Sequence, residues 1–240
     1  MSSVDDDIGN LVLLSLPAAT LTRIRPALEW RETKRGEIVQ RAGAPLEFAS
    51  FVNGGLVSLI KDMRDGRTVE VGEVGIEGIV APAALFGLNQ SVVDAVVEIP
   101  GSIMRLKHGI LRREMERDRA LHDLVSKCAR YSMIQLVQIA ACNRLHHIEE
   151  RCCRWLLTAR DNVRSDTFPL TQEYLAMLLG VQRAGVTEVA HALQDQGLIT
   201  YRRGVLTISN RAKLQAKACE CYRSLHDTRA TIFRDYRAFQ

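Results

Sequence analysis

Apolar positions follow different spacings in different parts of this chain. Residues 1 to about 28 hold two short helical patterns, Ile8–Leu14 and Pro17–Leu28. From Trp30 to about Leu106, short apolar runs are separated by Gly, Pro, Asn and Asp, which predicts six or more short strands. Asp65-Gly66 is a hairpin signal of the kind that needs positive φ. This region therefore favours a β-sandwich or barrel.

Helical spacing returns after Lys107. Residues 108–117 predict a short helix, and Asp118 to about Asn143 predict a helix of about seven turns with no Gly or Pro. Apolar and mildly polar side chains form a broad stripe along this helix. The stripe has two interpretations: the helix lies across its own barrel, or it forms the seam of a two-helix dimer. We favour the seam, with a register through Leu124, Cys128, Tyr131, Gln135 and Gln138.

The C-terminal part predicts a helix-turn-helix followed by a wing. His146–Val163 is amphipathic. Thr171 is a good N-cap for a helix that ends at Gly180, and a second helix follows, polar at its start and stopped by Gly197. Leu198–Arg202 and Val205–Ser209 alternate like strands around Arg203-Gly204. Two short helices with a polar start to the second suit the major groove of DNA.

Composition and charge agree with this interpretation. The chain has 240 residues, 47% hydrophobic and 25% charged, as in a globular protein. The formal net charge is +4, and residues 146–240 carry 14 Lys and Arg against 10 Asp and Glu, so the whole excess lies in the helix-turn-helix part. A basic DNA-binding half would be attracted to phosphate. No apolar run approaches the ~20 residues that span a bilayer, and the acidic start MSSVDDDIGN is unlike a secretory signal, so we expect a cytoplasmic protein with no membrane partner.

The six cysteines all lie in the C-terminal half, and no disulfide framework is expected. Cys142, His146, His147, Cys152 and Cys153 invite a metal interpretation, but no C-x-x-C is present, and we expect small buried cysteines and exposed histidines instead. Cys219 and Cys221, two apart on a predicted helix, are expected to diverge. No metal site and no cofactor are therefore predicted, and no catalytic motif such as G-x-S-x-G, a Walker loop or H-E-x-x-H is found.

Strands, a long helix and a winged helix, in this order, resemble the bacterial Crp/Fnr family of transcription regulators. The sharpest part is IEERCCRWLL…LTQEYLAMLLGVQRAGVTEVAHALQDQGLI, and GLVSLIKDMRDGRTVEVGEVGIEGIV is similar to the family's cyclic-nucleotide-binding jelly roll. The resemblance implies an α+β chain: a jelly-roll sensor domain over 1–117, a long connecting and dimerisation helix over 118–145, and a winged helix-turn-helix domain over 146–240.

The resemblance also implies which residues meet DNA. Thr171 and Gln172 would touch backbone phosphate, while Gln182, Arg183, Gly185 and Thr187 would lie at the start of the recognition helix. Arg183 takes the place of a base-reading arginine, which suits guanine O6 and N7. Ala184 and Glu188 stand where family members often carry other readers, so the operator is expected to differ; Glu188 is expected to be exposed or paired rather than to read cytosine. We expect Arg202 and Arg203 at the wing tip to contact phosphate.

The effector pocket departs further from the family pattern. Relatives that bind cyclic nucleotide carry Gly-Glu followed by an arginine that neutralises the phosphate. Here Glu77-Gly78 reverses the order, and no Arg or Lys occurs from Ile79 to Glu98, although Ser91 is available. A buried phosphate without a cation would be costly, so we do not expect cyclic AMP to bind in the usual way. No cysteine precedes Cys128, so an iron–sulfur centre of the oxygen-sensing kind is not expected either.

These observations predict a homodimeric regulator, not an enzyme, that binds double-stranded DNA at a palindromic operator, with RNA polymerase as a further possible partner. Its small-molecule effector is unknown. One alternative is a regulator without an effector, or one that responds to thiol oxidation. The absence of a cation from the predicted pocket favours this alternative, but an apolar effector would explain the same absence. Another is a metabolite-binding protein or enzyme whose winged helix serves protein contacts.

Overall fold

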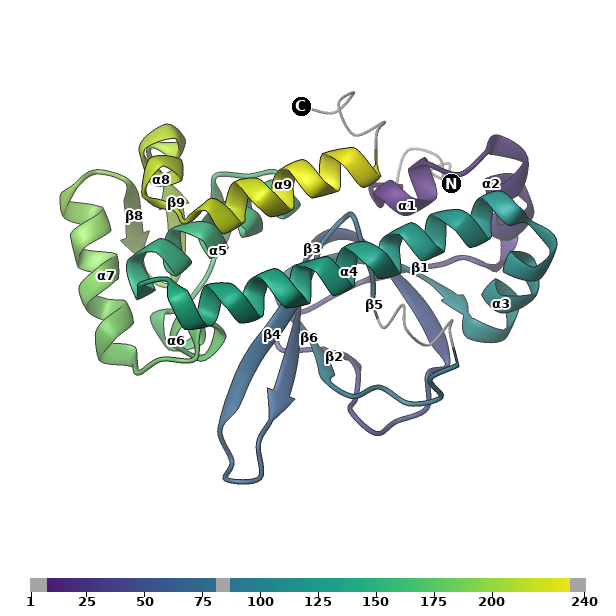
Figure 1. Ribbon diagram of the computed structural model, residues 1–240, viewed down its shortest axis with the longest axis horizontal. Coiled ribbons are helices and arrows are strands. Elements are labelled where there is room, and N and C mark those ends of the chain that lie inside the picture. The colour runs from purple at the N-terminus through teal and green to yellow at the C-terminus, as the bar shows by residue number, and fades with distance from the viewer. Residues whose placement is uncertain (1–7, 81–86, 234–240) are drawn as a thin grey trace.

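A computed structural model describes residues 8–80 and 87–233 of the chain. An antiparallel sheet forms the first half, a long helix crosses it, and a winged helix lies at one end of that long helix (Figure 1). In the part described, no helix is both long and apolar enough to cross a membrane.

Within the described residues the sheet has six strands, all antiparallel, in the order β1-β6-β3-β4, with β2 paired to β6 and β5 to β3. The strands are β1 Glu29–Glu32, β2 Ile38–Gln40, β3 Phe48–Asp62, β4 Thr68–Val74, β5 Ile79–Val80 and β6 Asp94–Lys107. The helices α1 Leu11–Leu14 and α2 Ala18–Ile24, followed by the short 3-10 helix η2 Arg25–Ala27, precede the sheet.

The expectation that every strand is short is wrong at two places, where apolar runs separated by glycine join into one long strand. The apolar runs on either side of Gly54-Gly55 form one strand, β3, and those on either side of Pro100-Gly101 form β6. Gly55 has φ +83°, and a Cβ on it would lie 2.4 Å from the Ile99 carbonyl oxygen. The two strands approach too closely here for side chains, and their pairing register shifts at the same place. These glycines therefore bend two long strands and do not turn the chain.

The hairpin predicted at Asp65-Gly66 is confirmed. It joins β3 to β4, Gly66 has φ +83°, and the Met63 amide donates to the Arg67 carbonyl at 2.8 Å. The Asp65 carboxylate accepts from the Arg67 amide at 3.1 Å, which fixes the turn further.

Helix α3 (His108–Arg117) leads into α4 (Arg119–Leu145). Asp118 caps α4, because its carboxylate accepts from the amides of Ala120 and Leu121. The same carboxylate accepts from Thr20 and Arg23 at 2.6 Å each, which binds α2 to the start of α4.

The predicted dimer register does not fit the structure. Leu124, Cys128, Tyr131 and Gln135 are at most 8% exposed within a single chain. Tyr131, for example, packs edge-on against Phe233, 6.2 Å between ring centroids. Gln138 is half-buried, and its amide donates to the Cys221 sulfur. This face of α4 is covered by the protein's own elements, so it cannot meet a partner.

The winged helix contains α5 Ile148–Val163, β7 Thr167–Pro169, α6 Gln172–Leu179, α7 Arg183–Asp195, β8 Ile199–Arg202, β9 Val205–Ile208 and α8 Arg211–Lys217. The wing has three strands rather than the two predicted, because β7 pairs with β9. Helix α6 ends as predicted at Gly180, whose φ is +63°.

The last helix, α9 (Glu220–Ile232), leaves the winged helix and runs back alongside α4 (Figure 1). Nothing in the sequence pattern indicated this return.

The sheet and the winged helix share one apolar core. Leu56, Ile60 and Ile99 of the sheet pack in the same cluster as Trp155 and Leu156 of α5. The two halves are therefore joined by buried apolar surface as well as by α4.

Candidate nucleic-acid interface

The first helix of the helix-turn-helix is fixed by its cap. The Thr171 hydroxyl accepts from the Tyr174 amide at 3.3 Å, as predicted for an N-cap. The next residue, Gln172, accepts at its amide oxygen from the Thr187 hydroxyl at 3.0 Å. Since Thr187 lies on α7, this bond joins the starts of the two helices.

The second helix presents its polar start to solvent. Gln182 occupies the N-cap position of α7 without a side-chain hydrogen bond to the helix, and Gln182, Arg183, Ala184 and Glu188 are all exposed. The opposite face buries Val186, Val189, Ala190 and Leu193 in the shared core or beside it. The exposed N-terminus of a helix also favours anions such as phosphate.

The wing tip lies beside the first helix. Arg203 and Gly204 have φ of +52° and +77°, as a two-residue hairpin turn requires. The Gly204 carbonyl accepts from the Leu170 amide at 2.9 Å, and a Cβ on Gly204 would lie 3.8 Å from the Thr171 methyl. The contacts from Gly204 through Thr171 and Gln172 to Thr187 place the wing tip and both helix starts on one continuous surface.

Two predicted contact residues have structural roles. Gly185 is half-buried, and a Cβ there would make an ordinary van der Waals contact with Cδ1 of Ile148 at 3.4 Å, so this residue faces α5. The Thr187 hydroxyl also donates to the Arg183 carbonyl at 3.0 Å. Arg202 and Arg203 are exposed at the wing tip.

The three residues predicted for the effector pocket do not come together. Glu77 is buried, and its carboxylate lies 3.5 Å from Arg229 of α9 and 3.2 Å from the Gly75 amide. Gly78 uses its carbonyl to accept from Asn10 and Val52. Only Ser91 lines the cavity described next.

This cavity, of about 460 Å³, lies between the sheet and α4. Its walls are almost wholly apolar, and the described lining residues include no Lys or Arg. The polar groups among them come chiefly from Gln90, Ser91, Ser132 and Gln135. The segment from Ile79 to Glu98, which contains no Lys or Arg, includes residues 81–86, and these lie outside the described residues.

Comparison with known families decides the identity of both halves. Residues 30–118 match the cyclic nucleotide-binding domain, and residues 150–217 match the Crp-like helix-turn-helix domain. The chain belongs to the Crp/Fnr family of transcription regulators.

Solved structures of Crp/Fnr proteins share the fold. FixK2 from Bradyrhizobium japonicum aligns with a TM-score of 0.68 at 16% identity, over 80% of this chain and 98% of its own. The CRP-family regulator TTHB099 from Thermus thermophilus gives 0.65 at 21% identity, over 78% and 96%. The c-di-GMP-responsive regulator CLP from Xanthomonas campestris gives 0.64 at 19%, over 80% and 99%. A search of curated proteins finds no match. This chain thus has the architecture of a Crp/Fnr-type transcription regulator.

In this Crp/Fnr regulator, buried charges join the winged helix to the sheet. Arg154 of α5 lies 3.1 Å from Glu73 of β4, and the indole nitrogen of Trp155 donates to Glu70 at 3.1 Å. Burial, and secondly the Glu73 charge, raise the pKa of Glu70 well above its usual range. Burial also raises the pKa of Glu98 to about 7, although Arg35 beside it acts in the opposite direction. Arg35 in turn stacks over the ring of Tyr174 on α6, 4.4 Å from its centre.

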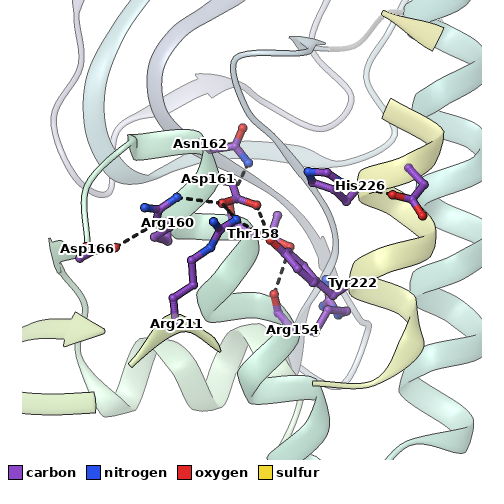
Figure 2. A network of polar contacts seen from close by, with 10 residues as sticks. Arg154, Thr158, Arg160, Asp161, Asn162, Asp166, Arg211, Tyr222 and His226 are labelled. Carbon is purple, nitrogen blue, oxygen red and sulfur yellow. Dashed lines mark hydrogen bonds and ion pairs between the residues drawn. The ribbon is translucent and has the colours of Figure 1, made fainter. Parts of the chain in front are cut away.

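A second polar network holds α8 and α9 against α5 (Figure 2). The Asp161 carboxylate accepts from the Tyr222 hydroxyl at 2.7 Å and lies 3.4 Å from both Arg160 and Arg211. Arg160 also pairs with Asp166 at 2.8 Å. The network therefore ties α8 and α9 to the C-terminal end of α5.

Two of the residues weighed and rejected as metal ligands, Cys142 and His146, meet two further cysteines that the sequence did not bring to them. Cys142, His146, Cys219 and Cys221 lie together, with one ligand atom of each within 4.8 Å of the others. The predicted divergence of Cys219 and Cys221 is wrong, because Cys219 is the N-cap of α9 and Cys221 lies in its first turn. The hydrogen bond with Cys219 lowers the pKa of Cys142 to about 5. Cys152 and Cys153 are buried apart from this group, as expected, and His147 is exposed and caps α5.

Proposed function

We propose that this Crp/Fnr regulator binds operator DNA as a homodimer, with α7 in the major groove. The observation that carries the proposal is the continuous surface made by the wing tip and the starts of α6 and α7. It exposes Arg183, Arg202 and Arg203, and no acidic side chain pairs with these arginines in the part of the chain that the structure describes.

Each residue has a role that follows from its position. Arg183, in the first turn of α7, reads a base edge, for which guanine is the natural partner. Thr171, Gln172, Gln182, Arg202 and Arg203 contact phosphate and fix the register of the helix on the duplex. Thr187 holds α7 against the start of α6, and Gly185 faces α5. Glu188 is exposed, and its negative charge disfavours phosphate nearby.

A second copy of the chain is expected on the exposed face of α4. Met133 and Val137 are 69% and 67% exposed, and Ala140 continues their row at helical spacing. Apolar side chains in a row on a long helix are typical of a two-helix seam. Two copies would present two recognition helices, which suits a palindromic operator. This row replaces the register predicted from the sequence.

The cavity beneath α4 suits an apolar effector. It is bounded by both the sheet and α4, so a ligand there touches the helix that carries the dimer face. A ligand acts only through different affinities for two arrangements of the winged helices. An apolar wall without a cation disfavours the phosphate of a cyclic nucleotide. Cyclic AMP should therefore leave the melting temperature unchanged, and a large upward shift would contradict this part of the proposal.

The test of DNA reading is fluorescence anisotropy with an operator obtained by genome-fragment selection. Wild-type affinity should fall steeply with salt. The Arg183→Ala variant should lose about 1–3 kcal/mol of specific binding and discriminate less at one base pair. Arg119→Ala removes an exposed arginine outside the winged helix and is the matched control. If Arg183→Ala binds the operator as tightly as the control does, α7 is not the reading helix.

A metabolite-binding protein or enzyme that uses the winged helix for protein contacts remains the alternative. It predicts no salt-dependent DNA binding for the wild type, so the same titration distinguishes the two functions. Cytoplasmic location and contact with RNA polymerase are further parts of the proposal; co-purification with polymerase on operator DNA would test the latter.

A further inference from the structure

The group of Cys142, His146, Cys219 and Cys221 has the composition of a metal site. Cys142 is in the last turn of α4 and His146 is its C-cap, while Cys219 and Cys221 begin α9. The three cysteines are buried, and the His146 side chain is 15% exposed. The four residues come from the end of one helix and the start of another, and Cys142 and Cys219 are 77 residues apart in the sequence.

The spacing of the ligand atoms fits a tetrahedral zinc ion. Bond lengths of about 2.3 Å to sulfur and about 2.0 Å to nitrogen place two ligand sulfurs about 3.8 Å apart, and a sulfur and a nitrogen about 3.6 Å apart. The Cys142 and Cys219 sulfurs are 3.6 Å apart, and the Cys221 sulfur is 3.6 Å from Nδ1 of His146. All four ligand atoms lie within 4.8 Å of one another, so one small ion among them can bind all four once the side chains draw in slightly.

The surroundings orient the ligands as metal sites usually require. The far nitrogen of His146, Nε2, lies 3.1 Å from the Glu220 carboxylate, so a proton there leaves Nδ1 free to bind metal. The Gln138 amide donates to the Cys221 sulfur at 3.0 Å. Glu220 and Gln138 are thus outer partners: they do not bind the metal, but they hold a histidine and a thiolate in the orientation that binds it.

Charge and packing point the same way. Three thiolates and one Zn²⁺ carry a net charge of −1, and two buried arginines, Arg151 and Arg154, lie on α5, the helix that begins two residues after His146. The three sulfurs form a small cluster of their own and belong to none of the larger apolar cores of the described residues. Packing in an apolar core therefore does not account for their being together.

We propose that Cys142, His146, Cys219 and Cys221 bind one structural zinc ion. Four protein ligands fill the tetrahedron and leave no position for a reacting water, so the role is structural. The ligands lie just before and just after the residues that match the helix-turn-helix domain, 150–217. Zinc would hold both ends of the DNA-binding domain at the hinge between α4 and α5. The site does not depend on how DNA is read.

The first experiment measures metal in the full-length, untagged protein purified under reducing conditions. After dialysis, elemental analysis should find about one zinc per chain. Replacement by Co²⁺ should give the intense visible absorption of a tetrahedral thiolate site. Iron in place of zinc, or a Cys142–Cys219 disulfide in freshly purified protein without metal, would overturn the proposal.

Variants then identify the ligands. Loss of an outer partner lowers metal affinity by about 10- to 100-fold. Glu220→Gln and Gln138→Ala should therefore bind zinc about tenfold more weakly, whereas Cys219→Ser and Cys142→Ser, which remove ligands, should lose more than about 100-fold. Cys152→Ser is the matched control, a buried cysteine outside the group. If a cysteine variant does not fold, His146→Asn tests the same ion, because His146 is the most exposed of the four ligands. A chelator should lower the melting temperature of the wild type and Cys152→Ser, but not of Cys142→Ser. Equal zinc content in the control and the ligand variants would rule the site out.

Discussion

The guanidinium of Arg154 and the carboxylate of Glu73 lie 3.1 Å apart, with side chains 3% and 0% exposed. They meet between α5 of the winged helix and β4 of the sheet. A buried ion pair contributes little net stability, but either partner left alone is a buried charge without compensation.

Removal of one partner should therefore be far more costly than removal of both. Arg154→Met should lower the free energy of unfolding by about 3 kcal/mol, because it leaves the buried Glu73 carboxylate without its cation. The double change Glu73→Leu with Arg154→Met should restore most of that loss, because no buried charge remains. Urea unfolding of the three proteins measures both effects. A single variant within about 1 kcal/mol of the wild type would show that water reaches this pair.

Burial of the Glu98 carboxyl makes the stability of the fold depend on pH. The pKa of Glu98 is about 7 in the folded chain and about 4.3 when unfolded. The folded state therefore holds the proton more tightly, and its stability falls as pH rises from about 4.3 to about 7. Glu98→Gln cannot ionise and escapes this loss.

The stability of Glu98→Gln relative to the wild type should accordingly improve by about 2 kcal/mol between about pH 5.5 and pH 8. Unfolding by urea at the two pH values measures the change. Glu37→Gln, at a less buried carboxylate that pairs with Arg31, is the control. A relative stability that does not change with pH would mean that Arg35 holds Glu98 ionised throughout.

Arg203 offers a way to remove charge from the wing without disturbing its fold. Its φ of +52° is unfavourable for most residues but is tolerated by asparagine. Arg203→Asn should keep or slightly raise the melting temperature, while the slope of log affinity against log salt falls by about 1. Parallel salt titrations of the variant and the wild type measure this. An unchanged slope would place the wing tip away from the DNA backbone.

The dimer face can be tested with a matched pair of valines. Val137 on α4 and Val92 beside the sheet are 67% and 63% exposed. Val137→Glu should convert the dimer into monomers, because a charge in an apolar seam loses its hydration, whereas Val92→Glu should not. Light scattering coupled to gel filtration gives the mass of each. If Val137→Glu remains dimeric, the copies meet on another face.

The sequence predicted those features that depend on neighbouring residues. Thr171 and Gly180 bound α6 through local hydrogen bonds and a left-handed turn, so their chemistry can be identified without the fold. The hairpin at Gly66 is of the same kind. Gly55, in contrast, bends a strand because another strand lies against it, and that approach depends on tertiary structure.

The seam and the cysteine group show the same limit. The apolar stripe of α4 was real, but Tyr131 and Gln135 face the protein's own elements, and which face is covered depends on where α9 returns. Cys142 and Cys219 meet for the same reason. No local pattern in the sequence predicts that the last helix, α9, runs back along α4.

The position of Trp155 in the shared core provides an optical probe. The chain has two tryptophans; Trp30 is 49% exposed, while Trp155 is fully buried with its indole nitrogen bonded to Glu70 across the boundary between the two halves. Any motion that separates the winged helix from the sheet must break that bond and admit water to the indole. The Trp30→Phe protein would then shift its emission to longer wavelength in step with the motion, so intrinsic fluorescence alone could time how quickly the DNA-binding half is released.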